Sequence, residues 1–116
     1  MIILKNKTNF PERILVQTSK KLITIAVKDI IRIEAFGDYS KLFTKENSFL
    51  SNFGISILET KFNPEIFIRV HRSSIININF VHEVSKNLTA FDVTMTNNDL
   101  VRVSRGYVYN MKKLKY

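Results

Sequence analysis

The chain has 116 residues, 45% of them hydrophobic, with two prolines and three glycines, and this composition is typical of one folded domain rather than a disordered segment. Eighteen Lys and Arg residues against ten Asp and Glu residues give a formal net charge of +8, which favours an anionic partner, nucleic acid first, over an acidic substrate pocket. The absence of cysteine excludes disulfides, thiolate chemistry and the commonest structural zinc sites.

Two hairpins are predicted in the first part of the chain. The apolar runs 14–16 and 22–27 flank a short polar stretch, which is typical of two strands joined by a turn. Alternation over 31–35, a break at Gly37 and a second run over 39–45 repeat the pattern.

A further short strand is predicted over 46–52, and an internal helix over 52–64. This helix would have Asn52 as its cap and would end at Pro64, with apolar residues at helical spacing between them. Because it is short, we expect it to support the fold rather than carry a site.

The β pattern returns at Phe67 and continues almost to the end of the chain. The predicted strands are 67–70, 73–79, 81–85, 89–97 and 100–104. Val101 and Val103 are expected to face inward, and a short helix over 106–114, with Ser104 near its cap, closes the chain. About nine short strands and two short helices predict a predominantly β architecture.

Membrane and export signals are not expected in this sequence. Crossing a bilayer takes an apolar run of roughly 20 residues, and none approaches that length. The apolar stretch near the start is too short, and too soon followed by charges, for a signal peptide. We expect a cytoplasmic protein, with residues 1–12 as an N-terminal extension and residues 13–116 as the domain.

Enzyme and metal-site interpretations have little support. His71 and His82 lie in separate strand-like segments, and only Glu83 adjoins either of them. There is no HExxH, CxxC or glycine-rich phosphate loop. We therefore expect no catalytic activity, no cofactor and no metal, and we expect His82 to be a surface or satisfied half-buried residue rather than a ligand.

Basic residues interrupt one apolar strand at its centre. Arg69, His71 and Arg72 stand within the stretch 65–79 with no acidic residue beside them. Buried arginines are costly unless they are paired, so this cluster is expected to face solvent or a partner. A second concentration of positive charge follows Asp99, after which the sequence has no acidic residue.

Three stretches carry a family resemblance. FIRVHRSSIIN resembles the signature of the LytTR family, with matches at Phe67, Arg69, His71, Arg72, Ser73 and Asn77. KKLITIAVKDIIRIEAFGDYSKLFTK is similar to the family's opening segment, and LVRVSRGYVYNMKKL to its closing Val-Ser-Arg and short helix. The resemblance covers about residues 13–115, in the family's order.

The resemblance implies an elongated, β-sandwich-like fold of about nine to ten short strands with two short helices. It also implies sequence-specific binding of double-stranded DNA through loops in the major groove, as the effector domain of a bacterial transcription regulator. In that family the domain usually follows a receiver domain of a two-component system or a membrane sensor, and binds paired promoter repeats. The sequence does not decide whether the domain binds DNA as a homodimer. Neither a membrane nor a small-molecule substrate is expected as a partner.

Carried over position by position, the family pattern assigns base reading to three loops. Ser40 and Lys41 follow the Gly37 turn, Arg72 stands in the second loop, and Arg105 stands in the third. Arginine suits bidentate contact with guanine in the major groove. The expected phosphate contacts are hydroxyls and cations beside these residues, namely Ser73, Ser104, Lys45 and Lys112.

The basic cluster cannot all point at DNA if its strand runs straight. Period two puts Arg69 and His71 on one face and Arg72 on the other. We expect Arg72 to face outward. Arg69 and His71 are expected in a supporting role, hydrogen-bonded to backbone or to a carboxylate such as Glu34.

Two other interpretations stay open. An RNA or single-strand binder built as a small β-barrel would also be basic and β-rich, but it would need exposed aromatic side chains on a strand face for base stacking. A protein-interaction module whose basic face meets an acidic partner would bind without sequence discrimination. Competition between specific and random duplex separates these possibilities.

Overall fold

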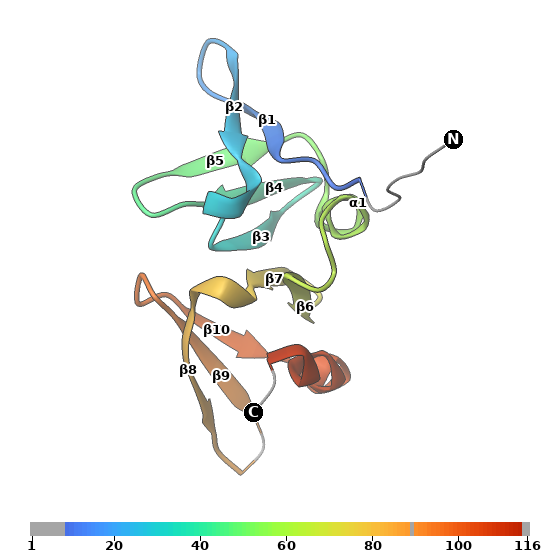
Figure 1. The fold of residues 1–116 in the computed structure, drawn as a ribbon, viewed down its shortest axis with the longest axis vertical. Helices are drawn as coiled ribbons and strands as arrows, with labels where there is room; N and C mark the ends of the chain where they lie inside the picture. Colours follow the sequence, from blue (N-terminus) through green and yellow to red (C-terminus); the bar gives the residue numbers. More distant parts are fainter. Residues whose placement is uncertain (1–8, 89, 115–116) are drawn as a thin grey trace, which may run out of the picture.

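The computed structural model describes residues 9–88 and 90–114, which form ten strands in two sheets, one α-helix and three 3-10 helices (Figure 1). The predicted mainly β architecture is therefore confirmed, with one α-helix and one longer 3-10 helix as its two helices. Most of the N-terminal extension predicted for residues 1–12 lies outside the described residues.

Sheet A has seven antiparallel strands in the order β2-β1-β5-β4-β3-β7-β6. Its strands are β1 (Arg13–Gln17), β2 (Leu22–Ala26), β3 (Arg32–Phe36), β4 (Tyr39–Phe43), β5 (Ser48–Ser51), β6 (Phe67–His71) and β7 (Ser74–Asn77). Both predicted hairpins are present, as β1–β2 and β3–β4. The β3–β4 turn places Gly37 at its first central position with φ of 62°, a backbone conformation that glycine adopts without steric cost.

Sheet B has three antiparallel strands in the order β10-β9-β8 and lies at the other end of the molecule (Figure 1). The remaining elements are β8 (Val81–Lys86), β9 (Phe91–Met95), β10 (Leu100–Val103), α1 (Ile55–Lys61), η1 (Val27–Asp29), η2 (Ile78–Phe80) and η3 (Arg105–Leu114). Val101 and Val103 are buried, as their alternation predicts.

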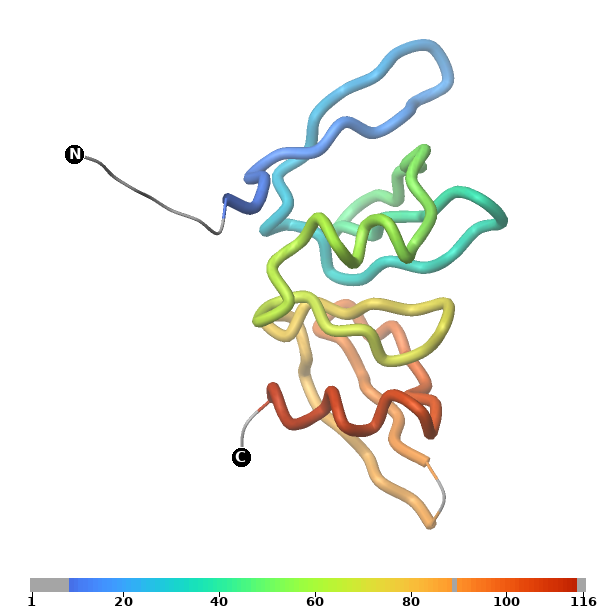
Figure 2. The backbone as a smooth tube through the Cα atoms, turned by 90° about the vertical axis from the view of Figure 1, so that its right-hand side faces the viewer, coloured from blue at the N-terminus to red at the C-terminus, as the bar shows by residue number. Residues whose placement is uncertain are grey.

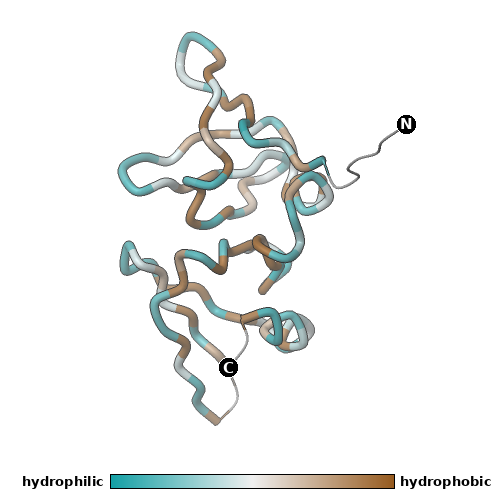
Figure 3. The backbone as a smooth tube through the Cα atoms, in the orientation of Figure 1, coloured by the Kyte–Doolittle hydropathy of each residue, from teal (hydrophilic) through white to brown (hydrophobic). Residues whose placement is uncertain are grey.

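Two hydrophobic cores lie on opposite faces of β6 and β7. Phe67 and Ile75 belong to the core that α1 and the β1–β2 hairpin cover, whereas Ile68 and Ile76 belong to the core that sheet B and η3 cover. Successive side chains of a strand point to opposite faces, so each of these strands contributes to both cores. Figure 3 shows apolar strand segments in the interior and polar residues at the β1–β2 and β4–β5 turns.

The helices differ from the predictions at their ends. Helix α1 begins after Gly54 rather than at Asn52, because the hydroxyl of Ser51 accepts the Phe53 N–H and the chain turns before helical bonding starts. The closing helix is a 3-10 helix whose first turn includes a bond from the Tyr107 N–H to the Ser104 carbonyl.

Candidate nucleic-acid interface

Three turns lie on one side of the molecule, distributed along its long axis. The first turn consists of residues 37–38, the second turn of residues 72–73, and the third is the start of η3. All three lie on the right-hand side of Figure 2. Backbone bonds connect the segments that hold them. The Ala35 N–H donates to the Ser73 carbonyl and the Ser104 N–H to the Val70 carbonyl, each at 2.9 Å. The fold therefore brings together three segments that are far apart in the sequence.

Arg72 and Arg105 present exposed guanidinium groups at two of these turns. Both side chains are exposed, and neither makes an ion pair with any residue that the structure describes. By contrast, the neighbouring Arg102 is held by Asp92, with 2.5 Å between Nε and Oδ1. Arg72 and Arg105 are thus available for a ligand, in the positions that the sequence predicts.

Arg69 has the supporting role that the sequence predicts, but a different carboxylate pairs with it. Its side chain is 8% exposed, and its Nη1 donates to Oε1 of Glu59 at 2.6 Å. Its other N–H groups donate to the carbonyls of His71, at 2.8 Å, and Arg72. Glu34, the expected partner, instead accepts from Arg32. Arg69 therefore fixes the backbone that carries Arg72.

A β-bulge in β6 changes the faces on which the three basic residues lie. Strict alternation would put Arg69 and His71 on the same face of the strand. The β6–β7 register pairs Arg69 with Ile75 and His71 with Ser74, so Val70 is the extra residue. An extra residue reverses the alternation beyond it. His71 accordingly lies beside β10, where it lines a groove with Leu100 and Val101. Sequence alternation alone could not predict this local change of phase.

His71 also shapes the second turn. Its Nδ1 accepts the Ser73 backbone N–H at 3.1 Å and lies 2.9 Å from the Ser73 hydroxyl. Ser73 was predicted as a phosphate contact, and its hydroxyl is engaged within the turn. The supporting role expected of His71 is confirmed by these contacts.

The prediction that Ser40 reads bases is at odds with its placement. Its side chain is 0% exposed, and its hydroxyl donates to the Phe53 carbonyl at 2.8 Å. Ser40 lies in the inward phase of β4 and ties the first turn to the segment before α1. Lys41, on the outward phase, remains at the surface, and its Nζ lies 4.5 Å from the centre of the Phe36 ring.

The other predicted phosphate contacts are spread more widely. Ser104 is half-buried at the start of η3, close to Arg105. Lys45 lies in the β4–β5 turn, at the opposite end of β4 from Gly37. Lys112 lies in the last turn of η3, which runs away from the side of the three turns (Figure 2). The structure does not bring Lys45 and Lys112 together with the base-reading candidates.

The sequence places Tyr39 in a proposed contact loop, but Lys20, Lys21 and Phe36, which also lie on this side, were missed. Lys20 and Lys21 are exposed in the β1–β2 turn, which extends toward the same side (Figure 2). Phe36 and Tyr39, paired across the β3–β4 turn, are 50% and 46% exposed. The alternation along β3, in which Glu34 and Phe36 alternate with apolar residues that face the core, could have predicted that Phe36 faces outward.

An ion-pair network holds sheet B against sheet A behind the second turn. Nε of Arg32 donates to Oδ2 of Asp99 at 2.7 Å and Nη1 to Oε1 of Glu34 at 3.1 Å. Burial by itself would raise the pKa of Asp99, but the hydrogen bonds from Arg32 and Asn97, with the Arg32 charge, hold that pKa below its ordinary value. Asp99 is therefore ionised at neutral pH and keeps the link intact.

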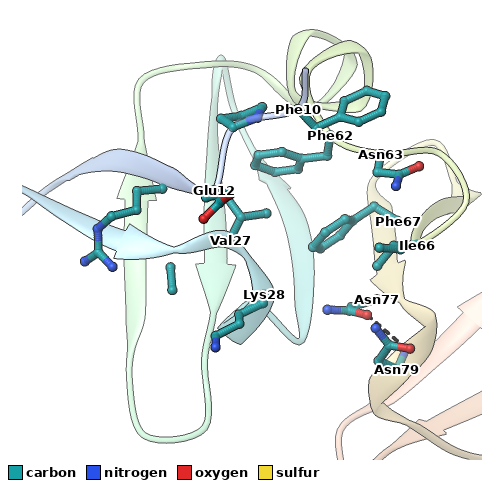
Figure 4. Close-up of a pocket in the computed structure, with 13 residues that line it drawn as sticks. Phe10, Glu12, Val27, Lys28, Phe62, Asn63, Ile66, Phe67, Asn77 and Asn79 are labelled. Carbon is teal, nitrogen blue, oxygen red and sulfur yellow. Dashed lines mark hydrogen bonds between the residues drawn. The ribbon is translucent and has the colours of Figure 1, made fainter. Parts of the chain in front are cut away.

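A cavity of about 490 Å³ lies near the start of the described chain (Figure 4). Phe62 and Phe67 line it with ring centres 5.0 Å apart, and Glu12 and Lys28 lie at its rim. Within the described ranges, no cluster of His, Asp and Glu is suited to a metal ion. No helix there is both long and apolar enough to span a membrane.

Comparison with known proteins identifies relatives for most of the chain. Residues 20–115 match the family model described as the LytTr DNA-binding domain. The heme-containing CO-sensing transcriptional regulators RcoM 2 and RcoM 1 of Paraburkholderia xenovorans are 33% and 32% identical over 107 residues, covering 88% of this chain and 39% of theirs. Transcriptional regulatory protein LytR of Staphylococcus aureus is 28% identical over 106 residues, covering 90% of this chain and 43% of LytR. The chain spans about two fifths of the length of these relatives.

A solved structure shares the fold. The LytTr DNA-binding domain of a Bacillus cereus protein described as a methyl-accepting/DNA response regulator matches with a TM-score of 0.84 and 23% identity. The match covers 91% of this chain and 99% of that one. The arrangement of two sheets and two helices is thus a known architecture.

Proposed function

Because the chain belongs to the family of LytTr DNA-binding domains, we propose that it binds double-stranded DNA sequence-specifically, as the effector domain of a bacterial transcription regulator. The observation that carries the proposal is the presence, on neighbouring turns of one side, of two exposed arginines, Arg72 and Arg105, that make no ion pair with any residue the structure describes. A guanidinium offers the paired donors that match guanine O6 and N7. The chemistry of base recognition is therefore present where the turns project.

Hydrogen bonds that hold the turns in place favour sequence-specific base recognition over sequence-independent electrostatic binding. Arg69 fastens the turn of Arg72 to α1, and the bonds between His71 and Ser73 fix the same turn from within. The Ser104 N–H anchors the start of η3 to β6. A turn whose backbone is already fixed loses less conformational entropy on binding, which favours affinity for a matching site.

Electrostatic attraction supplies the sequence-independent part of the affinity. The formal charge of +8 and the exposed Lys20 and Lys21 beside the turns favour contacts with the phosphate backbone. Such contacts position a protein on the duplex while base contacts specify the site. Both kinds of contact are available on the same side.

The wider assembly is part of the proposal. We take the chain to act with a receiver or sensor domain, since it spans about two fifths of its curated relatives. Binding to paired promoter repeats, with two copies of the domain on one duplex, would combine the binding free energies of two half-sites. Repeats spaced by about one helical turn would place both copies on the same side of the DNA.

A single-strand or RNA binder is the second candidate. The exposed rings of Phe36 and Tyr39 favour it, because aromatic side chains on a strand face can stack on unpaired bases. They form one pair at a hairpin end, however, whereas single-strand binders present several rings along a groove. Duplex binding is therefore the better supported of the two.

Selection from a random duplex library, followed by competition, tests the proposal. The expected result is one enriched sequence that the domain binds at least about tenfold more tightly than random duplex, and more tightly than either of its single strands. Equal binding to all duplexes would instead indicate a basic surface that binds anionic partners without sequence discrimination. Tighter binding to a single strand would favour the second candidate.

A further inference from the structure

The end of the β3–β4 hairpin carries an apolar surface that the arginine contacts do not use. Phe36 and Tyr39 lie opposite each other in the register, so their side chains share one face of the hairpin. They are 50% and 46% exposed and flank the Gly37 turn. Two half-exposed aromatic rings at one hairpin end form a surface patch rather than a scattered apolar residue.

Lys41 fixes the ring of Phe36 from the same face. Its Nζ lies 4.5 Å from the ring centre, and Lys41 stands two residues beyond Tyr39 on β4. A cation over an aromatic ring is attracted by the ring's quadrupole. The ring therefore keeps a defined orientation while its outer edge stays in solvent, next to a positive charge that can reach a phosphate.

The surface in front of Phe36 is open. Phe36 and Lys41 line a groove of about 400 Å³ together with residues 17–19 and 48–50. The negative charge on this face is partly compensated, because Glu34 accepts from Nη1 of Arg32 at 3.1 Å. Asp38, exposed in the turn between Phe36 and Tyr39, makes no ion pair with any described residue, so the unpaired carboxylate near the ring stands at the tip of the hairpin and not on the strand.

We infer that Phe36, held by Lys41 and flanked by Tyr39, contacts the C5-methyl group of a thymine in the major groove. The inference rests on the proposed function and adds a specificity determinant to it. In the major groove, thymine is distinguished by its methyl group, and an aromatic or aliphatic side chain is the matching contact. Because the first turn lies on the same side as Arg72 and Arg105, the three turns would read an A·T pair beside guanine-containing positions.

Deoxyuridine substitution tests the contact, since it removes the methyl group and leaves base pairing intact. Each thymine of the selected duplex is replaced singly, and affinities are measured by fluorescence anisotropy for the wild-type domain and for Phe36→Ala. The wild type is expected to lose about three- to tenfold affinity at one thymine position. Phe36→Ala is expected to bind the unsubstituted duplex with a similar loss, and to bind the thymine and deoxyuridine duplexes equally at that position.

Matched variants separate the ring from the fold and from the charge. Phe36→Leu keeps an apolar side chain and should keep part of the deoxyuridine response, also if Phe36→Ala folds poorly. Leu15→Ala removes a comparably exposed side chain, 55% accessible, from β1 and should keep the full response. Lys41→Ala should weaken binding to all duplexes and also reduce the deoxyuridine response, because the Phe36 ring loses the cation that orients it.

Three results would overturn the inference. One is a folded Phe36→Ala that discriminates thymine from deoxyuridine as the wild type does. Another is a wild type without a deoxyuridine response at any position, including a selected site that contains no thymine. The third is loss of DNA bending in Phe36→Ala with the methyl response unchanged, which would indicate a wedge between base steps. If no duplex is preferred at all, the proposed function fails first and this inference fails with it.

Discussion

The guanidinium of Arg69 joins α1 to the β6–β7 turn. Its Nη1 donates to Oε1 of Glu59 at 2.6 Å, while its other N–H groups donate to the His71 and Arg72 carbonyls. One buried side chain thus satisfies a carboxylate and two backbone acceptors. The position of Arg72 depends on a residue that does not itself face solvent.

Replacing Arg69 by Ala should therefore destabilise the domain. The change leaves Glu59 and two carbonyls without their donor and removes a well-packed side chain, at a cost of about 2 to 4 kcal/mol. Urea denaturation measures the free energy of unfolding. Arg72→Ala is the control, because its side chain is exposed and makes no ion pair with any described residue, so it should change stability by less than about 0.5 kcal/mol. Equal stability of the two variants would contradict the role of Arg69.

Arg72→Ala and Arg105→Ala should separate reading from folding. Each removes an exposed cation with no ion pair among the described residues, so the free energy of unfolding should change by less than about 0.5 kcal/mol. Each should cost about 1 to 3 kcal/mol on the selected duplex and relax the preference at one base position. Anisotropy titrations against duplexes varied at each position measure both effects. Full discrimination in a folded variant would move the reading surface elsewhere.

The salt dependence of binding should identify the phosphate contacts. If about five phosphates are neutralised, the slope of log affinity against log salt is about −4 to −5. The double variant Lys20→Ala, Lys21→Ala should lower its magnitude by about two, because these lysines lie on the side of the turns. Lys112→Ala should leave the slope unchanged, since the last turn of η3 lies away from that side. The reverse pattern would put η3 at the backbone.

Ser40→Ala tests whether the Ser40 hydroxyl supports the fold or reads bases. The buried hydroxyl donates to the Phe53 carbonyl, so its loss should destabilise the domain by about 1 kcal/mol. Sequence discrimination should persist, because the hydroxyl does not reach solvent. Ser48→Ala, at an exposed position of β5, is the matched control for stability. Loss of discrimination with unchanged stability would restore Ser40 as a reading residue.

Acid should weaken the link between the sheets through Asp99. Since the pKa of Asp99 in the folded state lies below the ordinary value of 3.8, its contribution to stability is fully present above that value and is lost as pH falls through the lower folded value. Asp99→Asn should cost about 1 to 2 kcal/mol at neutral pH. The difference from the wild type should stay constant down to about pH 5 and shrink below about pH 4. A difference that shrinks near pH 6 would implicate another group.

Sequence reasoning predicted most strands, because alternation and turn residues report burial on one face directly. Arg72 and Arg105 were assigned to exposed turns by the family resemblance, and both side chains are exposed. Sequence reasoning missed the partner of Arg69, since Glu59 lies on α1 and the pairing depends on packing between distant segments. It assigned base reading to Ser40 from the family pattern, whereas the strand alternation puts that residue in the phase of buried Leu42.

The alternation of β6 and β7 between two cores has a consequence for the smallest piece of chain that can bind. Removing sheet B would expose Ile68 and Ile76, and removing α1 with the first hairpin would expose Phe67 and Ile75. No cut through the domain leaves the strands around Arg72 covered on both faces. A shortened fragment that keeps the second turn is therefore expected to unfold around that turn. The recognition surface thus requires the whole domain.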